Sequence, residues 1–261
     1  MSGGFVYTRN KYNSIFCYNR HMKKLIIFLL IIVVSILAIS YQKAYQAQLG
    51  EDLITAAYEG DLIGVKNLLE EKAPLNYVLY FDDPARHYEN MDFDPLQAAA
   101  SSGNEKLISY LINKRLNVNI ENSHQWTPLF IAVRDGHAES AARLVRAGAN
   151  INHLTDTKAT ALIMALLADF KVEKERETLI EYLLKRGANP NLQTQWKTDA
   201  LYYAVTELKN PTIVQLLLKY KANVCRTYDG KTVPEIAPAP FRTLLQKTYQ
   251  QDCLVDNKKP Y

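Results

Sequence analysis

A period of 33 residues is the feature of this sequence that most restricts its fold. Leu96, Leu129 and Leu162 follow one another at that interval, and the same step separates Leu201 from Pro234. Adjacent aliphatic pairs recur in step with these markers: Leu68-Leu69, Leu111-Ile112, Leu144-Val145, Leu183-Leu184 and Leu216-Leu217. A fixed period of this length is typical of a structural unit that is stacked on copies of itself.

The most regular copy, residues 127–152, predicts two antiparallel helices. Thr127 is placed to cap a helix that begins at Pro128, where a proline costs no hydrogen bond. Gly136 ends this helix, and Gly148 follows the second one, where a positive φ is needed. Two helices of about ten residues cannot bury their apolar faces alone, so the unit requires neighbouring copies.

This unit resembles the ankyrin repeat. The family pattern Thr-Pro-Leu-His-x-Ala, followed by two helices, is matched by Thr127-Pro128-Leu129, and the unit ends on Gly148-Ala149-Asn150. The resemblance covers roughly three quarters of the chain. It implies an all-α ankyrin-repeat solenoid of five to six repeats over residues 51–247, with atypical terminal copies that act as caps. The fit is weaker at 199–224, where Asp199-Ala200-Leu201 departs from the motif.

Two insertions interrupt the period. The interval grows to 43 residues between Leu53 and Leu96, which places ten extra residues in the connector at 77–93. The interval from Leu162 to Leu201 is 39 residues, which places six extra residues near 169–177. Long connectors of this kind are often functional.

An apolar segment, residues 25–41, lies outside the repeat register. It contains no charged residue and follows a basic leader, residues 1–24. Its length falls between that of a signal-peptide core and that of a full membrane span, so we expect a transmembrane or signal helix that engages a membrane. Residues 42–50 are expected to form a short linker, and residues 248–261 a C-terminal tail.

The charges that flank the apolar segment predict its orientation. Arg20, Lys23 and Lys24 precede it and Lys43 follows it, so the positive-inside bias places the N-terminus in the cytoplasm and the repeats across the membrane.

Two start sites give two fates for this segment. With Met1 as the start, the polar leader favours an uncleaved single-pass anchor in the bacterial inner membrane, with the ankyrin domain in the periplasm. With Met22 as the start, cleavage after Ser40 would leave a soluble periplasmic or secreted protein.

The formal charge of +4 comes from the N-terminal region. The first 40 residues carry five basic and no acidic side chains, and the rest carries 26 basic against 27 acidic ones. We interpret this as a near-neutral body with no basic stripe, which argues against nucleic acid as the partner.

Ankyrin proteins bind other proteins mostly through the connector tips and the exposed side of each first helix, which together form a concave face. Transferred by resemblance, this face predicts the following partner-binding residues: His124, Trp126, Arg134, Asp135, Trp196 and Glu207. Tryptophan is a typical binding anchor. The alternative is that each indole packs against the neighbouring connector.

The connector at 77–93 is rich in aromatic and acidic residues. Aromatic side chains supply buried area and carboxylates steer association, a combination that suits a basic partner surface. This adds a second group of expected partner-binding residues: Tyr80, Phe81, Asp82, Asp83, Tyr88 and Phe93. The alternative is a loop that folds back over the first repeat.

The sequence contains no catalytic or nucleotide-binding signature, and we expect no cofactor and no metal site. His137 occupies a position where a structural hydrogen bond is the ordinary role. Cys225 and Cys253 would share a compartment that allows oxidation, so they form a possible disulfide; two free thiols are the alternative.

These observations favour a protein-protein interaction module, with an inhibitor or immunity-type protein as one form of that function. A structural envelope scaffold that associates with itself is the alternative. An enzyme with a pocket under the 77–93 loop, built on His87 with Glu89 or Asp92, is the least favoured interpretation.

Overall fold

The computed structural model describes the backbone of residues 10–83 and 88–254, and the side chains of residues 22–80 and 91–253. The chain divides into two compact units, Met1–Gln48 and Leu49–Tyr261.

Helix α1, Asn10–Glu59, is continuous, so residues 42–50, which we expected as a linker, are helical. Its apolar side chains from Leu25 to Ile39 are between 39% and 63% exposed. The part from Met22 to Glu59 is long and apolar enough to cross a membrane, although an N-terminal signal sequence has the same character. The last turns of α1 belong to the second unit, where Leu53 and Ile54 are fully buried.

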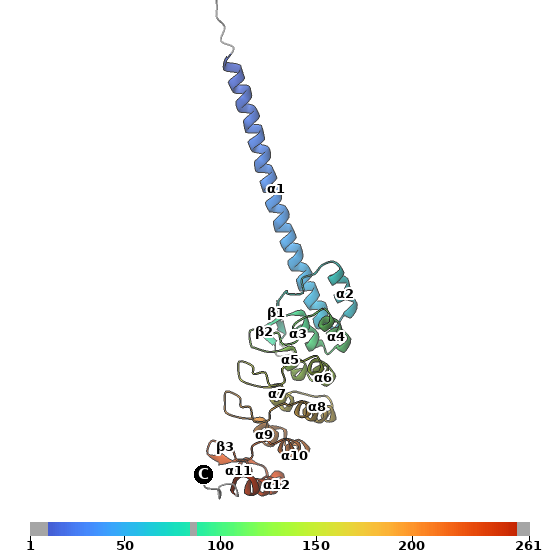
Figure 1. Cartoon of the computed structure of the whole chain (residues 1–261), viewed down its shortest axis with the longest axis vertical. Helices are drawn as coiled ribbons and strands as arrows, with labels where there is room; N and C mark the ends of the chain where they lie inside the picture. The colour runs from blue at the N-terminus through green and yellow to red at the C-terminus, as the bar shows by residue number, and fades with distance from the viewer. Residues whose placement is uncertain (1–9, 84–87, 255–261) are drawn as a thin grey trace, which may run out of the picture. The chain divides into compact units, whose positions relative to one another are not determined.

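The second unit is a stack of antiparallel helix pairs (Figure 1). After α1, the helices are α2 (Leu62–Glu70), α3 (Pro95–Ser102), α4 (Glu105–Asn113), α5 (Pro128–Arg134), α6 (Ala138–Arg146), α7 (Ala161–Leu167), α8 (Glu173–Lys185), α9 (Ala200–Tyr203) with the π-helical turn η2 (Ala204–Leu208), α10 (Pro211–Lys219), α11 (Val233–Ile236) and α12 (Ala239–Tyr249) with the π-helical turn η3 (Gln250–Leu254). One hydrophobic core runs through all pairs, from Leu49 to Leu245. The described chain is therefore mostly helical, as expected from the repeat period.

The first helix of each central repeat begins directly after a residue whose side chain caps it. Thr127 Oγ1 accepts a hydrogen bond from Phe130 N at 3.3 Å, and Thr160 Oγ1 accepts one from Ile163 N at 3.2 Å. In the second repeat Asp94 takes this role and forms a capping box with Gln97. These caps satisfy backbone donors that a helix start otherwise leaves free.

An asparagine ladder joins successive repeats after their second helices. Each rung is an asparagine Oδ1 that accepts the backbone N–H of an asparagine in the next repeat: Asn119 with Asn150, Asn152 with Asn189 and Asn191 with Asn223, at 2.7 to 2.8 Å. The Asn-x-Asn element of the sequence thus fixes the spacing between neighbouring repeats.

The long connector at 77–93 is a β-hairpin, which the helical period did not predict. Strand β1 (Leu79–Asp83) pairs antiparallel with β2 (Tyr88–Phe93), with Leu79 opposite Phe93 and a register shift between Phe81 and Asp83. Phe93 is fully buried, and its ring lies 6.3 Å from that of Tyr58 in the first repeat. The hairpin is thus a local addition to a fold that is otherwise helical, as predicted.

The insertion near 169–177 extends the start of helix α8, and its residues 171–175 are exposed. It adds a turn to α8, and Phe170 is only 6% exposed. Arg176, 8% exposed, lies over the Phe170 ring at 5.4 Å and donates from Nη1 to the Leu166 carbonyl at 3.2 Å. Its Nε lies 3.2 Å from a carboxylate oxygen of Glu173.

The C-terminal region is tied to the last repeats. Strands β3 (Thr227–Tyr228) and β4 (Lys231–Thr232) form a short hairpin before α11. A disulfide joins Cys225 to Cys253, with Cα atoms 5.5 Å apart. Residues 248–254 of the expected tail are helical.

Candidate functional site

Three successive connectors end in the same tight turn, at residues 122–125, 155–158 and 194–197. In each turn the last residue donates its N–H to the carbonyl of the first, at 2.8 to 3.0 Å. That last residue, Gln125, Lys158 or Lys197, has a positive φ of 56° to 61°. We call these three turns the connector tips.

The connector tips are bonded to one another. Asp156 N donates to the His124 carbonyl at 3.2 Å, and Gln195 N donates to the Thr157 carbonyl at 2.9 Å. Towards the first repeats, Ser123 N donates to a carboxylate oxygen of Asp92 in β2 at 2.9 Å. The tips therefore form a continuous row across repeats, which pre-organises it for binding.

The two tryptophans occupy different positions in this row. Trp126 follows the first tip and turns inward, with its ring 5.2 Å from Phe130 and 5.0 Å from the guanidinium of Arg134. It is partly buried and packs against the core. Trp196 lies within the third tip, at the position that His124 holds in the first, and is 63% exposed. Trp196 is therefore an accessible apolar anchor, while Trp126 braces its own repeat.

Arg134 and Asp135 lie at the end of α5, and both are mostly covered. Their side chains are 16% and 11% exposed and approach to 3.3 Å. Asp135 also accepts a hydrogen bond from the Ser101 hydroxyl at 2.6 Å. These contacts hold α3 and α5 together. Arg134 and Asp135 are therefore mainly structural, and only a small part of each side chain is accessible to a partner.

The other predicted residues on this face are more accessible. His124 lies 3.2 Å from Asp156 of the next tip, and both side chains are about 40% exposed. Glu207 is exposed on η2, where the first helix of its repeat loosens into a π-turn. Leu167, at the end of the neighbouring first helix α7, is 45% exposed.

The hairpin contributes less than the sequence predicted. Tyr80 is 66% exposed, but the prediction that Phe93 contacts a partner is wrong, because its side chain is fully buried. The hydrophobic effect takes this ring into the space between the first two repeats. The side chains of Phe81, Asp82, Asp83 and Tyr88 lie outside the described residues.

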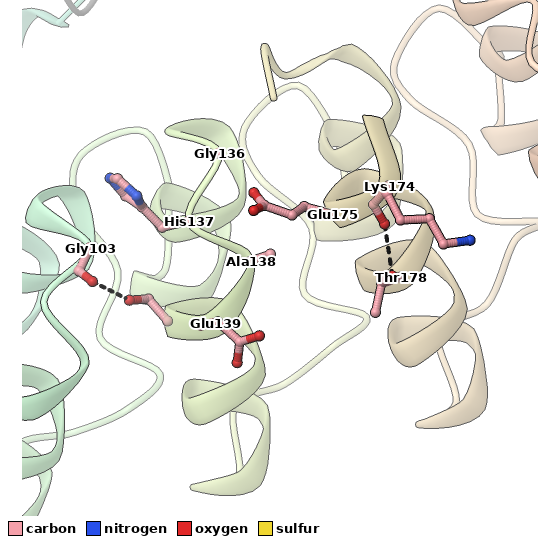
Figure 2. Close-up of a pocket in the computed structure, with 9 residues that line it drawn as sticks. Gly103, Gly136, His137, Ala138, Glu139, Lys174, Glu175 and Thr178 are labelled. Carbon is pink, nitrogen blue, oxygen red and sulfur yellow. Dashed lines mark hydrogen bonds between the residues drawn. The ribbon is translucent and has the colours of Figure 1, made fainter. Parts of the chain in front are cut away.

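A cavity of about 380 Å³ opens between α6 and α8 (Figure 2). Glu175 extends from α8 towards α6, while the amine of Lys174 points away. His137 Nε2 lies 2.9 Å from the Ser101 carbonyl, which gives this ring a structural role. The described lining includes the carboxylates of Glu139 and Glu175 and the hydroxyl of Thr178. None of these lining residues forms a nucleophile–base pair of the kind that covalent catalysis needs.

Two ionisable groups are strongly influenced by burial. Burial raises the pKa of Asp94 to about 6, against the opposing effect of hydrogen bonds from Gln97 and Leu96 N–H. Burial and the neighbouring charge of Asp199 raise the pKa of Tyr228. Both groups lie at helix starts or repeat boundaries, away from the connector tips. Among the residues that the structure describes, no group of three His, Cys, Asp or Glu side chains is placed to hold a metal ion.

Stacked helical hairpins with a row of ordered connector tips define a repeat protein of the solenoid class. Residues 53–155 match the family model for ankyrin repeats in three copies. Residues 53–155 of this chain are therefore ankyrin repeats, as the Thr-Pro-Leu and Gly-Ala-Asn elements predicted.

Several curated proteins are similar to parts of the chain. An ankyrin repeat-containing protein of Treponema pallidum is 27% identical over 126 residues, 48% of this chain and 40% of the relative. An ankyrin repeat, SAM and basic leucine zipper domain-containing protein of Mus musculus is 30% identical over 44% of this chain and 24% of its own length. An ankyrin repeat protein of fowlpox virus is 31% identical over 45% of this chain and 34% of its own length. The chain spans less than half the length of each.

Proposed function

We propose that the repeat domain binds a protein partner through the connector tips and the adjoining ends of the first helices. The observation that supports this most directly is Trp196, 63% exposed on an otherwise ordered turn. Tryptophan is enriched among the residues that contribute most to protein–protein binding, and on this connector tip its ring is accessible to a partner. Tyr80 on the hairpin, His124 on the first connector tip and Glu207 on η2 provide further accessible side chains.

We also propose that the apolar run of α1 is an anchor in the bacterial inner membrane, with the repeats in the periplasm. The exposure of the run on all sides and the basic residues before it support this proposal. An inhibitor or immunity-type role fits a small binding domain held at that membrane. Cleavage after Ser40, which would release the domain, remains the competing outcome.

Site-specific crosslinking tests the binding surface. The full chain carries a photoreactive phenylalanine analogue in place of Trp196, and a matched variant carries it in place of Ile63, which is 71% exposed on α2. We expect a discrete product with another protein from position 196 and not from position 63. The partner, once purified, should bind Trp196→Ala at least about tenfold more weakly than wild type, and Ile63→Ala like wild type.

Three results would contradict these proposals. Crosslinks from position 196 only to a second copy of the chain would favour the structural scaffold. Equal binding by Trp196→Ala and wild type would remove Trp196 as an anchor. A mature protein whose mass corresponds to a start after Ser40 would replace the anchor with a cleaved signal.

A further inference from the structure

The second helices of four successive repeats end in exposed basic side chains. These residues are Lys114, Arg115, Arg146, Lys185, Arg186, Lys219 and Lys221. The asparagine ladder runs along the same ends of α4, α6, α8 and α10, so the seven residues share one border of the stack, which we call the basic edge. The expectation of a body without a basic stripe is therefore wrong.

Acidic side chains gather at the opposite ends of the same helices. Glu105, Glu139, Glu173, Glu175 and Glu177 lie within the first turns of α4, α6 and α8. Lys106, Lys174 and Arg176 also lie in these first turns, so this border carries mixed charge. The basic edge is offset in the net charge by acidic residues distributed over the rest of the chain, which is why composition hides it. On the basic edge, Glu181 pairs with Lys185 at 2.7 Å, and in the first repeat Glu70 and Glu71 accompany Lys72, so the basic character begins with the second repeat.

Helix dipoles account for part of this arrangement, because a positive charge is favourable at a helix C-terminus. Helix dipoles do not explain the residue types at Arg115 and Lys221, both of which have a φ of 66°. The equivalent positions of the two repeats between them are glycines, Gly148 and Gly187. A left-handed conformation is unfavourable for a residue with a Cβ, and glycine would relieve it. Basic side chains are thus present where the fold alone favours glycine.

The chain enters the repeat domain at this same border. The Tyr77 ring, just after α2, packs against Gly50, and its hydroxyl donates to Glu51 at 3.2 Å. At the other end of the first helix pair, Asn104, the cap of α4, donates to the Gly60 carbonyl at 2.7 Å. Leu49 therefore lies on the side where the second helices end. Residues 42–48, which separate it from the apolar run, span about 10 Å as helix.

We propose that the basic edge docks on the anionic phospholipid surface of the membrane that holds α1. The inference rests on the proposed membrane attachment. Basic side chains close to an anionic leaflet gain attraction from each added charge. The seven-residue connection limits the distance between that leaflet and the entry point of the domain, and the attraction decays over a Debye length of about 8 Å.

The basic edge is long and open, which favours binding to a planar lipid surface over binding to a macromolecule that must fit a pocket. The seven side chains are long, exposed and distributed over four repeats. Three of them lie on neighbouring tyrosine rings: Lys114 on Tyr110, Arg186 on Tyr182 and Lys219 on Tyr220, at 5.2 to 5.9 Å. A row of basic side chains of this kind can pair with many anionic headgroups of a flat lipid surface at once.

Lysine footprinting of the full chain in lipid nanodiscs tests the proposal. The chain is incorporated into discs of phosphatidylcholine, or of phosphatidylcholine mixed with phosphatidylglycerol, and acetylation at Lys114 and Lys185 is followed by mass spectrometry. We expect roughly fivefold slower acetylation in the anionic discs, reversed by raised salt, with unchanged rates at Lys158 and Lys197 on the connector tips.

A pair of matched variants separates the basic edge from general charge effects. Replacing Arg186, Lys219 and Lys221 with glutamine should abolish most of the protection at Lys114 and Lys185. Replacing Lys158, Lys197 and Lys231 with glutamine removes the same charge from the other border of the connectors and should leave the protection intact. Far-ultraviolet circular dichroism of both variants checks that the domain is folded.

The outcomes discriminate between the proposals. Incorporation into both discs with equal acetylation rates would overturn the docking and leave the membrane attachment standing. Failure to incorporate would overturn both. Protection in neutral discs on addition of duplex DNA or polyglutamate, without protection by the anionic lipid, would assign the edge to an acidic macromolecule instead.

Discussion

Arg226 Nη1 donates a hydrogen bond to Oδ2 of Asp199 at 2.7 Å, across the boundary between the last two repeats. Asp199 is fully buried and also accepts from the Tyr228 hydroxyl at 2.6 Å and from Tyr202 N at 3.1 Å. The equivalent positions of the two preceding repeats hold a threonine cap, Thr127 or Thr160. A buried carboxylate thus replaces a neutral cap and depends on the last repeat for its partners.

Removing the arginine should leave this carboxylate without its charged partner. We expect Arg226→Ala to lower the free energy of unfolding by about 3 kcal/mol, because a buried charge loses its compensation. The double variant Asp199→Thr/Arg226→Ala restores a neutral cap and should recover most of that loss. Urea unfolding followed by circular dichroism measures both. A double variant as unstable as the single one would contradict the explanation.

The Cys225 to Cys253 disulfide should stabilise the same end of the stack. In a Cys17→Ser background we expect no thiol to react with iodoacetamide in the unreduced folded chain, and two after reduction. Loop-closure entropy predicts that serine at both positions costs about 3.5 kcal/mol. Two reactive thiols before reduction would show that the cysteines are free.

The two tryptophans should differ in solvent access. With Phe in place of Trp126, the remaining emission comes from Trp196 and should be strongly quenched by acrylamide. With Phe in place of Trp196, the remaining Trp126 should be protected. We expect Trp126→Ala to cost about 2 kcal/mol of stability through lost packing, and Trp196→Ala less than about 0.5 kcal/mol. Equal quenching in the two Phe variants would refute the assignment.

Glycine should stabilise the chain at left-handed positions of the basic edge. Arg115→Gly and Lys221→Gly relieve a positive φ and should each raise the free energy of unfolding by about 0.5 kcal/mol, after the larger entropy of the unfolded chain is included. Lys114, adjacent to Arg115, has φ −78°. Lys114→Gly is therefore the matched control and should destabilise the chain. The same sign for all three variants would exclude backbone strain as the cause.

Asp94 should make stability depend on pH. Its folded pKa of about 6 lies above the ordinary aspartate value of 3.8, so the folded state binds the proton more tightly. The resulting stabilisation is present in full below pH 3.8 and is lost as the pH rises through 6. We expect the wild type to gain about 2 kcal/mol over Asp94→Asn between pH 7 and pH 4.5. A difference that is constant across thermal or urea unfolding at these pH values would contradict the burial of an ionisable Asp94.

Most of the fold was predictable because its determinants are local and repeated. Thr127 caps a helix at the expected position and Thr160 takes the same role in the next repeat, and the asparagines after the second helices form the ladder that sets the spacing. The insertions were located by their departure from the period, but their structures were not. The 77–93 connector forms a hairpin because Phe93 is buried between repeats, a long-range contact that no periodicity reports.

The sequence by itself determined the repeat unit, its register and the apolar segment outside it, since each follows from residue spacing along the chain. Only the tertiary structure decided which way the two tryptophans face, because Trp126 has Phe130 and Arg134 to pack on, whereas Trp196 is exposed at a tip. It also decided the charge pattern. Basic residues spread over a hundred positions become one edge because stacking brings equivalent helix ends side by side.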